Sequence, residues 1–407
     1  MIPRLIILAQ PKGPASCGAG GLARVPSTVR CIDLSSPPLY RGCRKPQMNI
    51  VKSTRKYEDW LRQFTSVWEA DLRLKHQHMK ESLFMFLRAT FYRWAQVWPE
   101  VCSSLAKAPR VLAVGDLHVE NLGTWRDAEG RLIWGVNDFD EACELPFAND
   151  LVRLAASAAL AIEEKHLALS RKAACEAILE GYERNLKAGG QPFVLEEEHG
   201  WLRGLALNEL RDPVHFWKKV DSLPPVKATV PVTALEALHQ LLPDKDVTCR
   251  ILRRVAGLGS LGHQRLVAVA EWRGGRIARE AKALVASACY WAASDGGSPE
   301  IMYPAILSRA IRCPDPFVQV RGKWILRRLS PHCCRLELEA MPKDRDELKL
   351  LAAMGAETAN IHLGAPKVAD NIQRYLRKQP ASWLHSAAKD MARMVEADWR
   401  AWRKSGA

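Results

Sequence analysis

The sequence predicts a mixed α+β fold with two lobes, a mostly helical larger lobe and a smaller lobe built on an antiparallel sheet. The chain has 407 residues, of which 48% are apolar, and this length exceeds what one ordinary core holds. Its predicted elements run in the order helices, two strands, helices, a group of strands and helices again. This order lacks a regular βαβ alternation and contains no internal repeat, which favours an α+β fold.

Residues 1–47 differ in composition from the rest of the chain. They are rich in Pro, Gly, Ser and Arg, show no helical or strand period and carry seven Lys or Arg against Asp33 alone. Met48 then opens MNIVKSTRKYEDWLRQF, which is typical of a helix start. We predict that residues 1–47 lie outside the fold, either as a non-native extension before a true start at Met48, as a disordered basic tail or as a transit-like peptide.

The formal net charge of +14 divides into +6 for residues 1–47, from seven cations and one acid, and +8 for the remainder. So mild an excess suits anionic ligands such as phosphate and argues against a nucleic-acid partner. The eleven cysteines are scattered without a C-x-x-C pair. No window approaches the roughly 20 apolar residues of a membrane span. We therefore expect a cytoplasmic protein without a membrane partner; the sequence does not indicate its oligomeric state.

Helical periodicity covers three parts of the chain. Residues 57–98 include SLFMFLRATFYRWAQVW, whose aromatic face at i, i+3, i+4 and i+7 is expected to be core. Asp150 is expected to cap the Ala-rich helix LVRLAASAALAIEE, and SRKAACEAILEGYERNLKAG predicts another helix. The chain is predicted to be helical again from about Asp344 to its end.

Strand patterns fall in two groups. RVLAVG and RLIWGVND flank GDLHVENLG and the turn RDAEG, and we expect them to form a hairpin. After Val247 follow RRVAGLGSLGHQRLVAVAEW, the turn RGG, RIAREAKALVASA and a strand pair near FVQVRGKWILRRLS. The predicted organisation is a helical lobe with a catalytic hairpin over 48–246, a β-rich lobe over 247–340 and a helical segment over 341–407 that packs on the larger lobe.

Two polar stretches have the spacing of a phosphoryl-transfer site. In protein kinases the catalytic Asp precedes a metal-binding Asn by five positions, and a second Asp follows on a hairpin. Asp116 and Asn121 have this spacing, and Asp138 in NDFD follows them. Asp140 is a candidate second metal ligand, or else turns toward solvent or a basic side chain. An isolated G-D-x-H also occurs in ordinary polar turns. His118 could contact phosphate or orient Asp116, and a satisfied loop histidine is the simpler expectation.

The segment GDLHVENLG…VNDFDEACELPFANDLVRLAAS resembles the signature of the DUF2252 family of uncharacterised bacterial proteins. That signature is itself similar to the catalytic core of aminoglycoside phosphotransferase and choline-kinase-like enzymes. The resemblance runs from about Lys75 to the C-terminus, through GLGSLGHQR, REAKAL and ETANIHLG. It implies a protein-kinase-like fold in which Asp116 is the catalytic base, Asn121 and Asp138 bind magnesium, and Asp150 anchors the loop.

A glycine-rich stretch, GLGSLGHQR, lies between predicted strands. Because glycine lets backbone N–H groups approach phosphates, we predict that it contacts nucleotide through Gly257, Gly259, Ser260 and Gly262. The following strand offers Arg279 and Lys282 for the phosphates, although either could be a solvated strand residue. The resemblance aligns Arg279 with a position that is often Lys. Kinases place this loop before the catalytic residues, whereas here it follows by about 140 residues, so the predicted fold is circularly permuted.

Further basic side chains leave two interpretations open. Arg327, Arg328 and Arg335 in WILRRLSPHCCRLEL could clamp phosphate or acceptor, or line the exposed face of an edge strand, and the second is the simpler expectation. His362 in ETANIHLG is explained as a core histidine or as a cation near a helix C-terminus.

The expected activity is a magnesium-dependent transfer of a phosphoryl or nucleotidyl group from ATP or another nucleoside triphosphate to a small-molecule or protein acceptor. One alternative is a metal-dependent phosphoesterase, whose first motif resembles VLAVGDLH; the G-D-x-x-D-R-G and G-N-H-D/E segments that complete such a site do not occur. The other is a non-catalytic, kinase-like scaffold that binds nucleotide.

Overall fold

The computed structural model describes residues 48–406 except 197, 207–211, 228, 245, 294–297, 334, 336, 341–345 and 366. The predicted N-terminal extension, residues 1–47, lies outside the described residues. Every described residue belongs to one compact unit, Leu39–Ala407. Within the described part, no helix is long and apolar enough to cross a membrane.

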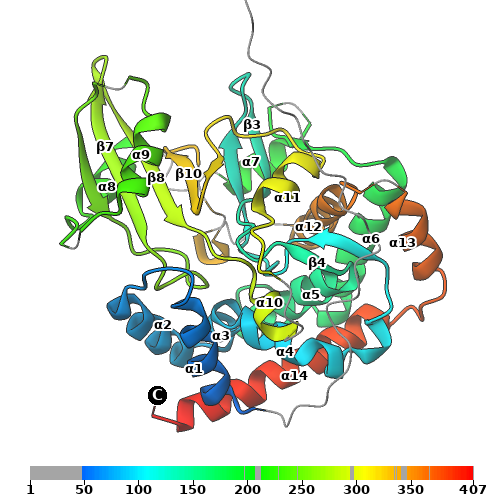
Figure 1. The fold of residues 1–407 in the computed structure, drawn as a ribbon. Helices are drawn as coiled ribbons and strands as arrows, with labels where there is room; N and C mark the ends of the chain where they lie inside the picture. Colours follow the sequence, from blue (N-terminus) through cyan, green and yellow to red (C-terminus); the bar gives the residue numbers. More distant parts are fainter. Residues whose placement is uncertain are drawn as a thin grey trace, which may run out of the picture. The chain divides into compact units, whose positions relative to one another are not determined.

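Helices and three small antiparallel sheets make up the described chain, so the predicted mixed α+β class is confirmed (Figure 1). The first helices are α1 (Ile50–Leu61), α2 (Glu69–Glu81), α3 (Leu83–Ala89) and α4 (Phe91–Val101). Asn49 and Ser82 cap α1 and α3 by accepting hydrogen bonds from the backbone N–H groups of Lys52 and Met85. The predicted aromatic face is buried in the largest apolar core through Phe84, Phe86, Phe91, Trp94 and Trp98.

The pairing of the next strands differs from the predicted hairpin. β1 (Arg110–Ala113) pairs with β4 (Cys143–Pro146), whereas β2 (Leu122–Arg126) pairs with β3 (Leu132–Val136). The reason is the turn, in which Asp127 Oδ1 accepts hydrogen bonds from the N–H groups of Glu129 and Arg131. This side-chain-stabilised turn joins β3 to the strand immediately before it, so β1 finds its partner beyond the hairpin. β5 (Phe193–Val194) extends β3 on its other edge.

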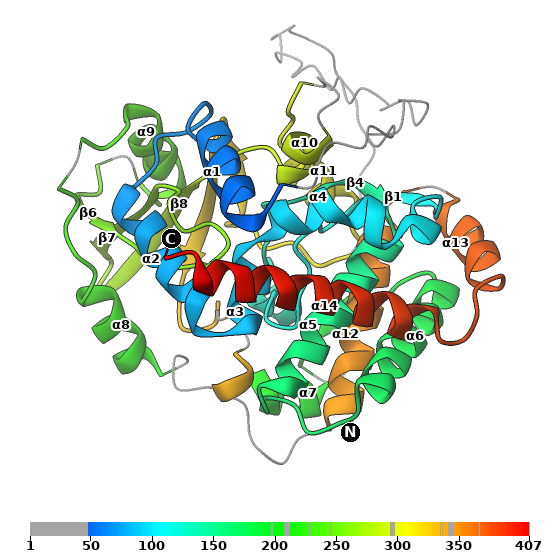
Figure 2. The same cartoon turned by 90° about the horizontal axis from the view of Figure 1, so that it is seen from below.

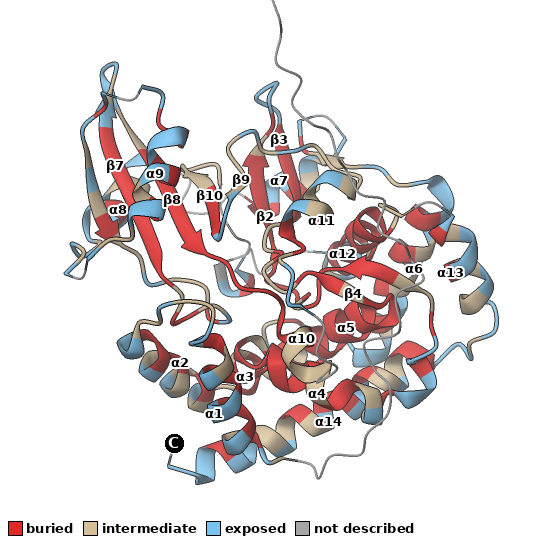
Figure 3. Ribbon diagram, viewed as in Figure 1, coloured by how far each residue is buried: buried red, intermediate tan, exposed pale blue. Residues whose placement is uncertain are grey.

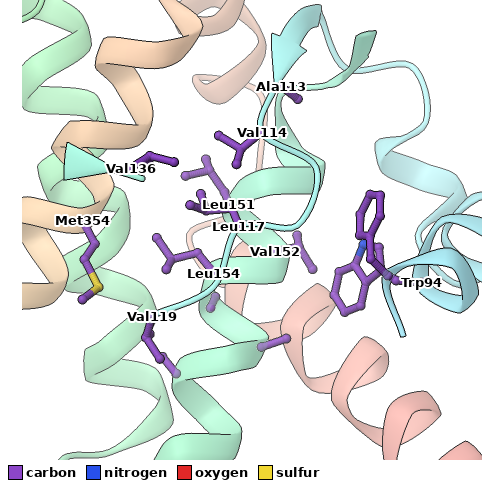
Figure 4. Close-up of a cluster of buried hydrophobic side chains, with 14 of the residues drawn as sticks. Trp94, Ala113, Val114, Leu117, Val119, Val136, Leu151, Val152, Leu154 and Met354 are labelled. Atoms are coloured by element: carbon purple, nitrogen blue, oxygen red, sulfur yellow. The ribbon is translucent and has the colours of Figure 1, made fainter. Parts of the chain in front are cut away.

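Four long helices pack against one another, and one of them, α12, also packs against β1 and β3: α5 (Ala148–Glu163), α6 (Arg171–Ala188), α12 (Glu347–His362) and α14 (Trp383–Lys404). Figure 4 shows apolar side chains of β1, of the loop after it and of α5 packed together, with Met354 of α12 beside them. Figure 2 shows α14 lying along α5 and α3. Helices α6 and α12 touch at glycines, because a Cβ on Gly181 would lie 1.8 Å from the Ala352 carbonyl oxygen.

The predicted cap of α5 is wrong. The helix begins at Ala148 with Phe147 in the N-cap position, and Asp150 lies inside the first turn. The predicted helix over SRKAACEAILEGYERNLKAG is α6, capped by Ser170. The C-terminal region is helical as predicted, with α13 (Val368–Leu376) between α12 and α14.

A five-stranded antiparallel sheet has the order β6-β7-β8-β10-β9. Its strands are β6 (Cys249–Arg253), β7 (Arg265–Trp272), β8 (Gly275–Ala283), β9 (Gln319–Arg321) and β10 (Trp324–Leu329). The strands predicted on either side of the RGG turn and near FVQVRGKWILRRLS are confirmed, whereas the first strand lies before the predicted RRVAG and shares only Arg253 with it. Helix α9 (Val232–Leu241) packs on one face and α8 (Pro213–Asp221) on the other, each over its own apolar cluster. Figure 3 shows that β7 and β8 are buried over most of their length.

Strand β10 lies between β8 and β9 and is therefore not an edge strand. β9 pairs only with Trp324–Leu326, so Arg327 and Arg328 have a neighbouring strand on the β8 side alone. The expectation that they line an exposed face is nevertheless wrong, because Arg327 bonds the Tyr303 hydroxyl, Arg328 bonds the Arg126 carbonyl oxygen, and both side chains are only partly exposed. The remaining described helices are α7 (Gly200–Ala206), α10 (Ala288–Ala293) and α11 (Tyr303–Arg309).

Candidate functional site

A pocket opens between the 115–123 loop that follows β1, helices α1 to α4 and the glycine-rich loop 257–262 that joins β6 to β7. Its cavity volume is about 50 Å³, and the pocket is partly open to solvent. The predicted site residues that line it are Asp116, Asn121, Asp138, Asp140, Gly257, Gly259 and Ser260. Two segments about 140 residues apart in the sequence therefore meet at one pocket.

The 115–123 loop is fixed from below by a buried carboxylate. Asp150 accepts hydrogen bonds from the backbone N–H groups of Val114 (2.7 Å) and Gly115 (3.0 Å). His362 Nε2 lies 3.1 Å from Asp150 Oδ2, and His362 Nδ1 lies 2.9 Å from the Tyr182 hydroxyl. Since all three side chains are almost fully buried, Asp150 holds the loop where the resemblance implies, and His362 is a core histidine.

Gly115 is required where the loop leaves β1. Its φ is +80°, and a Cβ there would lie 2.3 Å from the Glu141 carbonyl oxygen. A side chain at this position would push apart the 115–123 loop and the turn that carries Asp138 and Glu141. The glycine of the G-D-x-H motif therefore keeps the two carboxylate-bearing segments together.

Asp116 is held from two sides. Arg153 of α5 donates from Nε to Asp116 Oδ1 at 2.9 Å and also from Nη2 to the same oxygen. A Cβ on Gly259 would lie 3.3 Å from Asp116 Oδ2, so the glycine-rich loop approaches the other oxygen. The ion pair with Arg153 orients the carboxylate and leaves Oδ2 toward the pocket.

Asn121 ties the two acidic segments together. Its Nδ2 donates to the backbone carbonyl oxygens of Asp116 and Asp138, both at 3.1 Å. The Asn121 side-chain oxygen makes no hydrogen bond with any described residue, and Asn121 lines the pocket. The amide is therefore oriented with an oxygen available to a ligand.

Lys282 of β8 connects the sheet to the carboxylates. Its Nζ lies 3.2 Å from Asp138 Oδ2 and 2.5 Å from Asp140 Oδ2, and the side chain is fully buried. Burial opposes ionisation of Asp138, yet Lys282 and Arg327 hold its pKa well below the usual range. Burial and the neighbouring Asp138 raise the pKa of Asp140 to about 6. One carboxylate of the pair is therefore firmly ionised, and the other takes up a proton more readily.

The glycine-rich loop has the backbone that its sequence predicts. Gly257 and Gly262 have φ angles of +77° and +103°, which favour glycine. Ser260 Oγ accepts a hydrogen bond from Arg265 Nη2 at 3.0 Å, and the Gly262 carbonyl accepts one from the backbone N–H of Trp68 at 2.9 Å. The loop is thus supported by its own sheet and by the start of α2.

Arg279 is not brought to the pocket. Side chains along a strand alternate between its two faces, and Arg279 lies three positions before Lys282. Arg279 is therefore on the opposite face of β8. There it donates to the carbonyl oxygen of Leu241 and stacks on the Phe317 ring. Of the two cations predicted for this strand, the geometry brings only Lys282 to the carboxylates.

Several pocket residues were missed in the sequence. Lys75 of α2 is buried and donates from Nζ to the Gly259 carbonyl oxygen at 2.7 Å. Arg88 of α3 lines the pocket, and Arg153 holds Asp116. A signal existed for Arg153, a lone cation in an otherwise apolar helix. Lys75 and Arg88 lie in helices with ordinary polar and aromatic neighbours, and no sequence pattern distinguishes them.

The donor set suits a magnesium ion that is bound together with phosphates. Asp138 supplies an ionised carboxylate, Asn121 an amide oxygen, and Asp140 a buried Oδ1 that has no hydrogen-bond partner in the described part of the chain. No group of three or more His, Cys, Asp or Glu that could hold a metal occurs among the described residues. Magnesium often takes one or two carboxylates, with phosphate and water as its other ligands, so the residues fit an ion that arrives with substrate.

The family model named DUF2252, described as an uncharacterized protein conserved in bacteria, matches residues 68–201. This match supports the family assignment over that part of the chain, which contains Asp116, Asn121, Asp138 and Asp150. It ends before the glycine-rich loop and Lys282. Neither a curated protein nor a solved structure matches the chain.

Proposed function

We propose that the protein is a magnesium-dependent phosphotransferase that takes a phosphoryl group from ATP or another nucleoside triphosphate. The observation that carries this proposal is the contact of Lys282 with Asp138 and Asp140. These two carboxylates line the pocket together with Asp116, Asn121 and the glycine-rich loop, and Lys282 lies behind them. A lysine, a carboxylate for metal, a carboxylate for the acceptor and a flexible phosphate-covering loop are the parts that phosphoryl transfer requires.

The arrangement of the sheet supports a kinase-like, two-lobed and circularly permuted fold. In protein kinases a glycine-rich loop covers the phosphates and the phosphate-binding lysine lies on the third strand. Here the loop joins β6 to β7, the first two strands of the sheet, and Lys282 lies on β8, the third. The chain order is the difference, because this sheet follows the 115–123 loop. Kinases also pair the lysine with a helix glutamate, whereas Lys282 pairs with Asp138 and Asp140.

The proposed mechanism divides the work between the two acidic segments. Asn121 and Asp138, with Asp140 beside them, would hold magnesium, which supplies charge neutralisation for the phosphates. Lys282 would move its ammonium from the carboxylates to a phosphate oxygen, and the backbone of the glycine-rich loop would cover the phosphates. Asp116 Oδ2 would accept the proton of the acceptor hydroxyl, while Arg153 keeps the carboxylate in orientation.

Two other functions have less support. A two-metal phosphoesterase needs a cluster of His and carboxylate ligands, and the described residues contain no such group. A non-catalytic nucleotide-binding scaffold needs neither the Arg153 ion pair nor an Asp116 oxygen directed to the pocket. Catalytic transfer therefore accounts for more of the geometry than either alternative.

Nucleotide binding is tested by thermal unfolding with and without ATP and Mg²⁺. Ligand at about one hundred times Kd adds roughly 2.7 kcal/mol to stability, so the midpoint should rise by several degrees. The rise should require magnesium and should be lost in Asp138→Asn. The matched control is Asp390→Asn, an exposed acid of α14, which should respond as the wild type does.

Catalysis is tested with Asp116→Asn by following ATP turnover with ³¹P NMR, water serving as acceptor. We expect about 100-fold slower turnover or more, with the magnesium-dependent thermal shift retained. Full turnover in Asp116→Asn would remove its role as base. No thermal shift with any nucleoside triphosphate, together with a shift on Mn²⁺ or Zn²⁺ alone, would instead favour the phosphoesterase.

A further inference from the structure

We propose that Arg335, together with Arg88 and His118, forms a site for an oxyanion, a carboxylate or a phosphate group, carried by the acceptor substrate. This inference rests on the proposed phosphotransferase function. The three side chains line the same pocket as Asp116. They reach it from three parts of the chain: helix α3, the 115–123 loop and the segment after β10.

The backbone holds Arg335 beside the 115–123 loop. Arg335 forms an isolated antiparallel bridge with Gly123, two residues after Asn121. Glu120 connects Arg88 to the segment that carries Arg335. Its Oε2 accepts a hydrogen bond from Arg88 Nη1 at 2.5 Å, and its Oε1 accepts one at 3.2 Å from the backbone N–H of Leu338, three residues after Arg335. The two arginines are thus attached to the same short loop through different contacts.

The charges of this group are not balanced. Glu120 pairs with Arg88, whereas the Arg335 side chain forms no hydrogen bond or ion pair within the described part of the chain. Arg88 Nε is buried and has no partner among the described residues. Burial and repulsion by Arg88 lower the pKa of Arg335 to about 10. Glu120 is paired with Arg88, and Asp138, the other acid that acts on Arg335, is paired with Lys282. Arg335 therefore has no carboxylate partner of its own, and a planar oxyanion matches the donors of a guanidinium.

His118 adds a neutral donor to the same wall. Its Nδ1 accepts a hydrogen bond from the backbone N–H of Glu120 at 3.2 Å, so the proton of the neutral ring is on Nε2. Burial, and then the charges of Arg88 and Arg335, hold the pKa of His118 well below its usual range. The ring can therefore donate to an anion without becoming charged.

The position of the group favours the acceptor over the nucleotide. Lys282 and Arg327 already accompany Asp138 on the sheet side of the pocket. Arg88, His118 and Arg335 are instead attached to residues 118–123, which follow Asp116 directly. An acceptor whose hydroxyl reaches Asp116 would place a neighbouring anionic group against these three side chains, so we infer an acceptor that carries both a hydroxyl and an oxyanion.

The test uses inorganic phosphate as the probe on the full chain. Protein saturated with Mg²⁺ and a non-hydrolysable ATP analogue is titrated calorimetrically with phosphate, and then with malonate to represent carboxylates. Arg335→Gln should bind the preferred probe about tenfold to hundredfold more weakly, with affinity for the ATP analogue within about twofold of wild type. Arg335→Lys should fall between. Arg321→Gln, at an exposed arginine of β9, should match wild type.

Two results would overturn the inference. One is equal affinity of wild type and Arg335→Gln for both probes. The other is an equal loss of affinity for the ATP analogue, which would assign Arg335 to the nucleotide. If wild type does not bind the analogue at all, the proposed function fails, and titration of the free protein still tests Arg335: a loss of phosphate binding confined to Arg335→Gln and Arg335→Lys would retain the oxyanion site.

Discussion

The two sides of the pocket are built in different ways. The acidic side is set by buried hydrogen bonds inside the largest core, with Asp150 holding the 115–123 loop and Arg153 holding Asp116. The sheet side has two small apolar clusters of its own and joins the largest core through a few residues, among them Leu258, Leu261 and Ile325. Its contacts with the acidic segments and with α2 at the pocket are polar, chiefly those of Lys282 with Asp138 and Lys75 with Gly259. Folding therefore fixes the position of the carboxylates. The hydrogen bonds and ion pairs across the pocket, in contrast, can be replaced by bonds to a substrate.

The largest expected effect comes from breaking the link between the two sides. Lys282→Met should destabilise the protein by roughly 3–4 kcal/mol, the lower part of the range for a buried ion pair. It removes the nearest cation from Asp138 and Asp140, which are only partly buried, and Arg327 remains 3.8 Å from Asp138. Millimolar Mg²⁺ should restore part of this loss in the variant and change the wild type little. Urea unfolding measures both effects, with the exposed Lys389→Met as control. Unchanged stability would show that the link is dispensable.

A second change tests the acidic side alone. Asp150→Ala removes the acceptor of two buried N–H groups and the partner of His362. We expect a loss of roughly 2–4 kcal/mol of unfolding free energy. Asp370→Ala removes an exposed acid from the first turn of α13 and should cost well under this amount. If the two variants lose equal stability, the 115–123 loop does not depend on Asp150.

The third prediction is that the contribution of Glu357, on the acidic side of the pocket, to the unfolding free energy depends on pH. Burial raises the pKa of Glu357 to about 7, although it accepts hydrogen bonds from Val136 and Asn360. The unfolded carboxyl loses its proton near its ordinary value, so this group's contribution to stability falls as pH rises from about 4.5 to 7. Relative to wild type, Glu357→Gln should therefore gain about 2 kcal/mol between pH 5 and 7.5.

Gln forms different hydrogen bonds from Glu, so wild type and Glu357→Gln are expected to differ in unfolding free energy by a constant amount at every pH. The prediction concerns only the part of this difference that changes with pH. Urea titrations at both pH values measure it. A difference that stays constant across this range would mean that Glu357 ionises normally in the folded protein.

The smallest expected effect concerns the sheet side. Gly257→Ala and Gly274→Ala both place alanine at positive φ, +77° and +82°, and each should cost about 1 kcal/mol. Only at Gly257 would the Cβ meet side chains, Arg265 Nη2 at 2.9 Å and Ser260 Oγ at 3.1 Å. We therefore expect weaker binding of Mg-ATP in Gly257→Ala alone, measured by the thermal shift. Equal affinities would separate the loop from nucleotide binding.

Local patterns predicted most of the fold. Helices α1 to α4, α6 and α12 to α14 lie where helical periodicity was predicted, and β7 and β8 follow their strand runs and the RGG turn. The strand pairing of β1 did not follow, because the turn that Asp127 stabilises pairs β3 with β2 and leaves β1 to pair with β4 beyond the hairpin. The cap of α5 was misplaced since an acid in the first turn and an N-cap acid look alike in sequence.

Some residues of the candidate site could likewise be predicted from the sequence, and others could not. The D-x-x-x-x-N spacing brought Asp116, Asn121 and Asp138 together by sequence pattern alone, and the glycine-rich loop meets them in the structure. Strand alternation separates Lys282 from Arg279, but the sequence does not show which face of β8 is turned to the acids. Lys75 and Arg88 required the tertiary structure, because they come from different helices and only the pocket unites them. Arg335 was one of three arginines that the sequence offered as a clamp for phosphate or acceptor, and the pocket lining distinguishes it from Arg327 and Arg328.

The burial of Lys282 has a consequence for how the protein can be observed in solution. An amine without exposed surface, and already bonded to two carboxylates, reacts with an acylating reagent only during those intervals in which the sheet moves away from the acids. The acylation rate of Lys282, measured by mass spectrometry, therefore reports how often the pocket opens. Any molecule that bridges the two sides of the pocket should lower this rate.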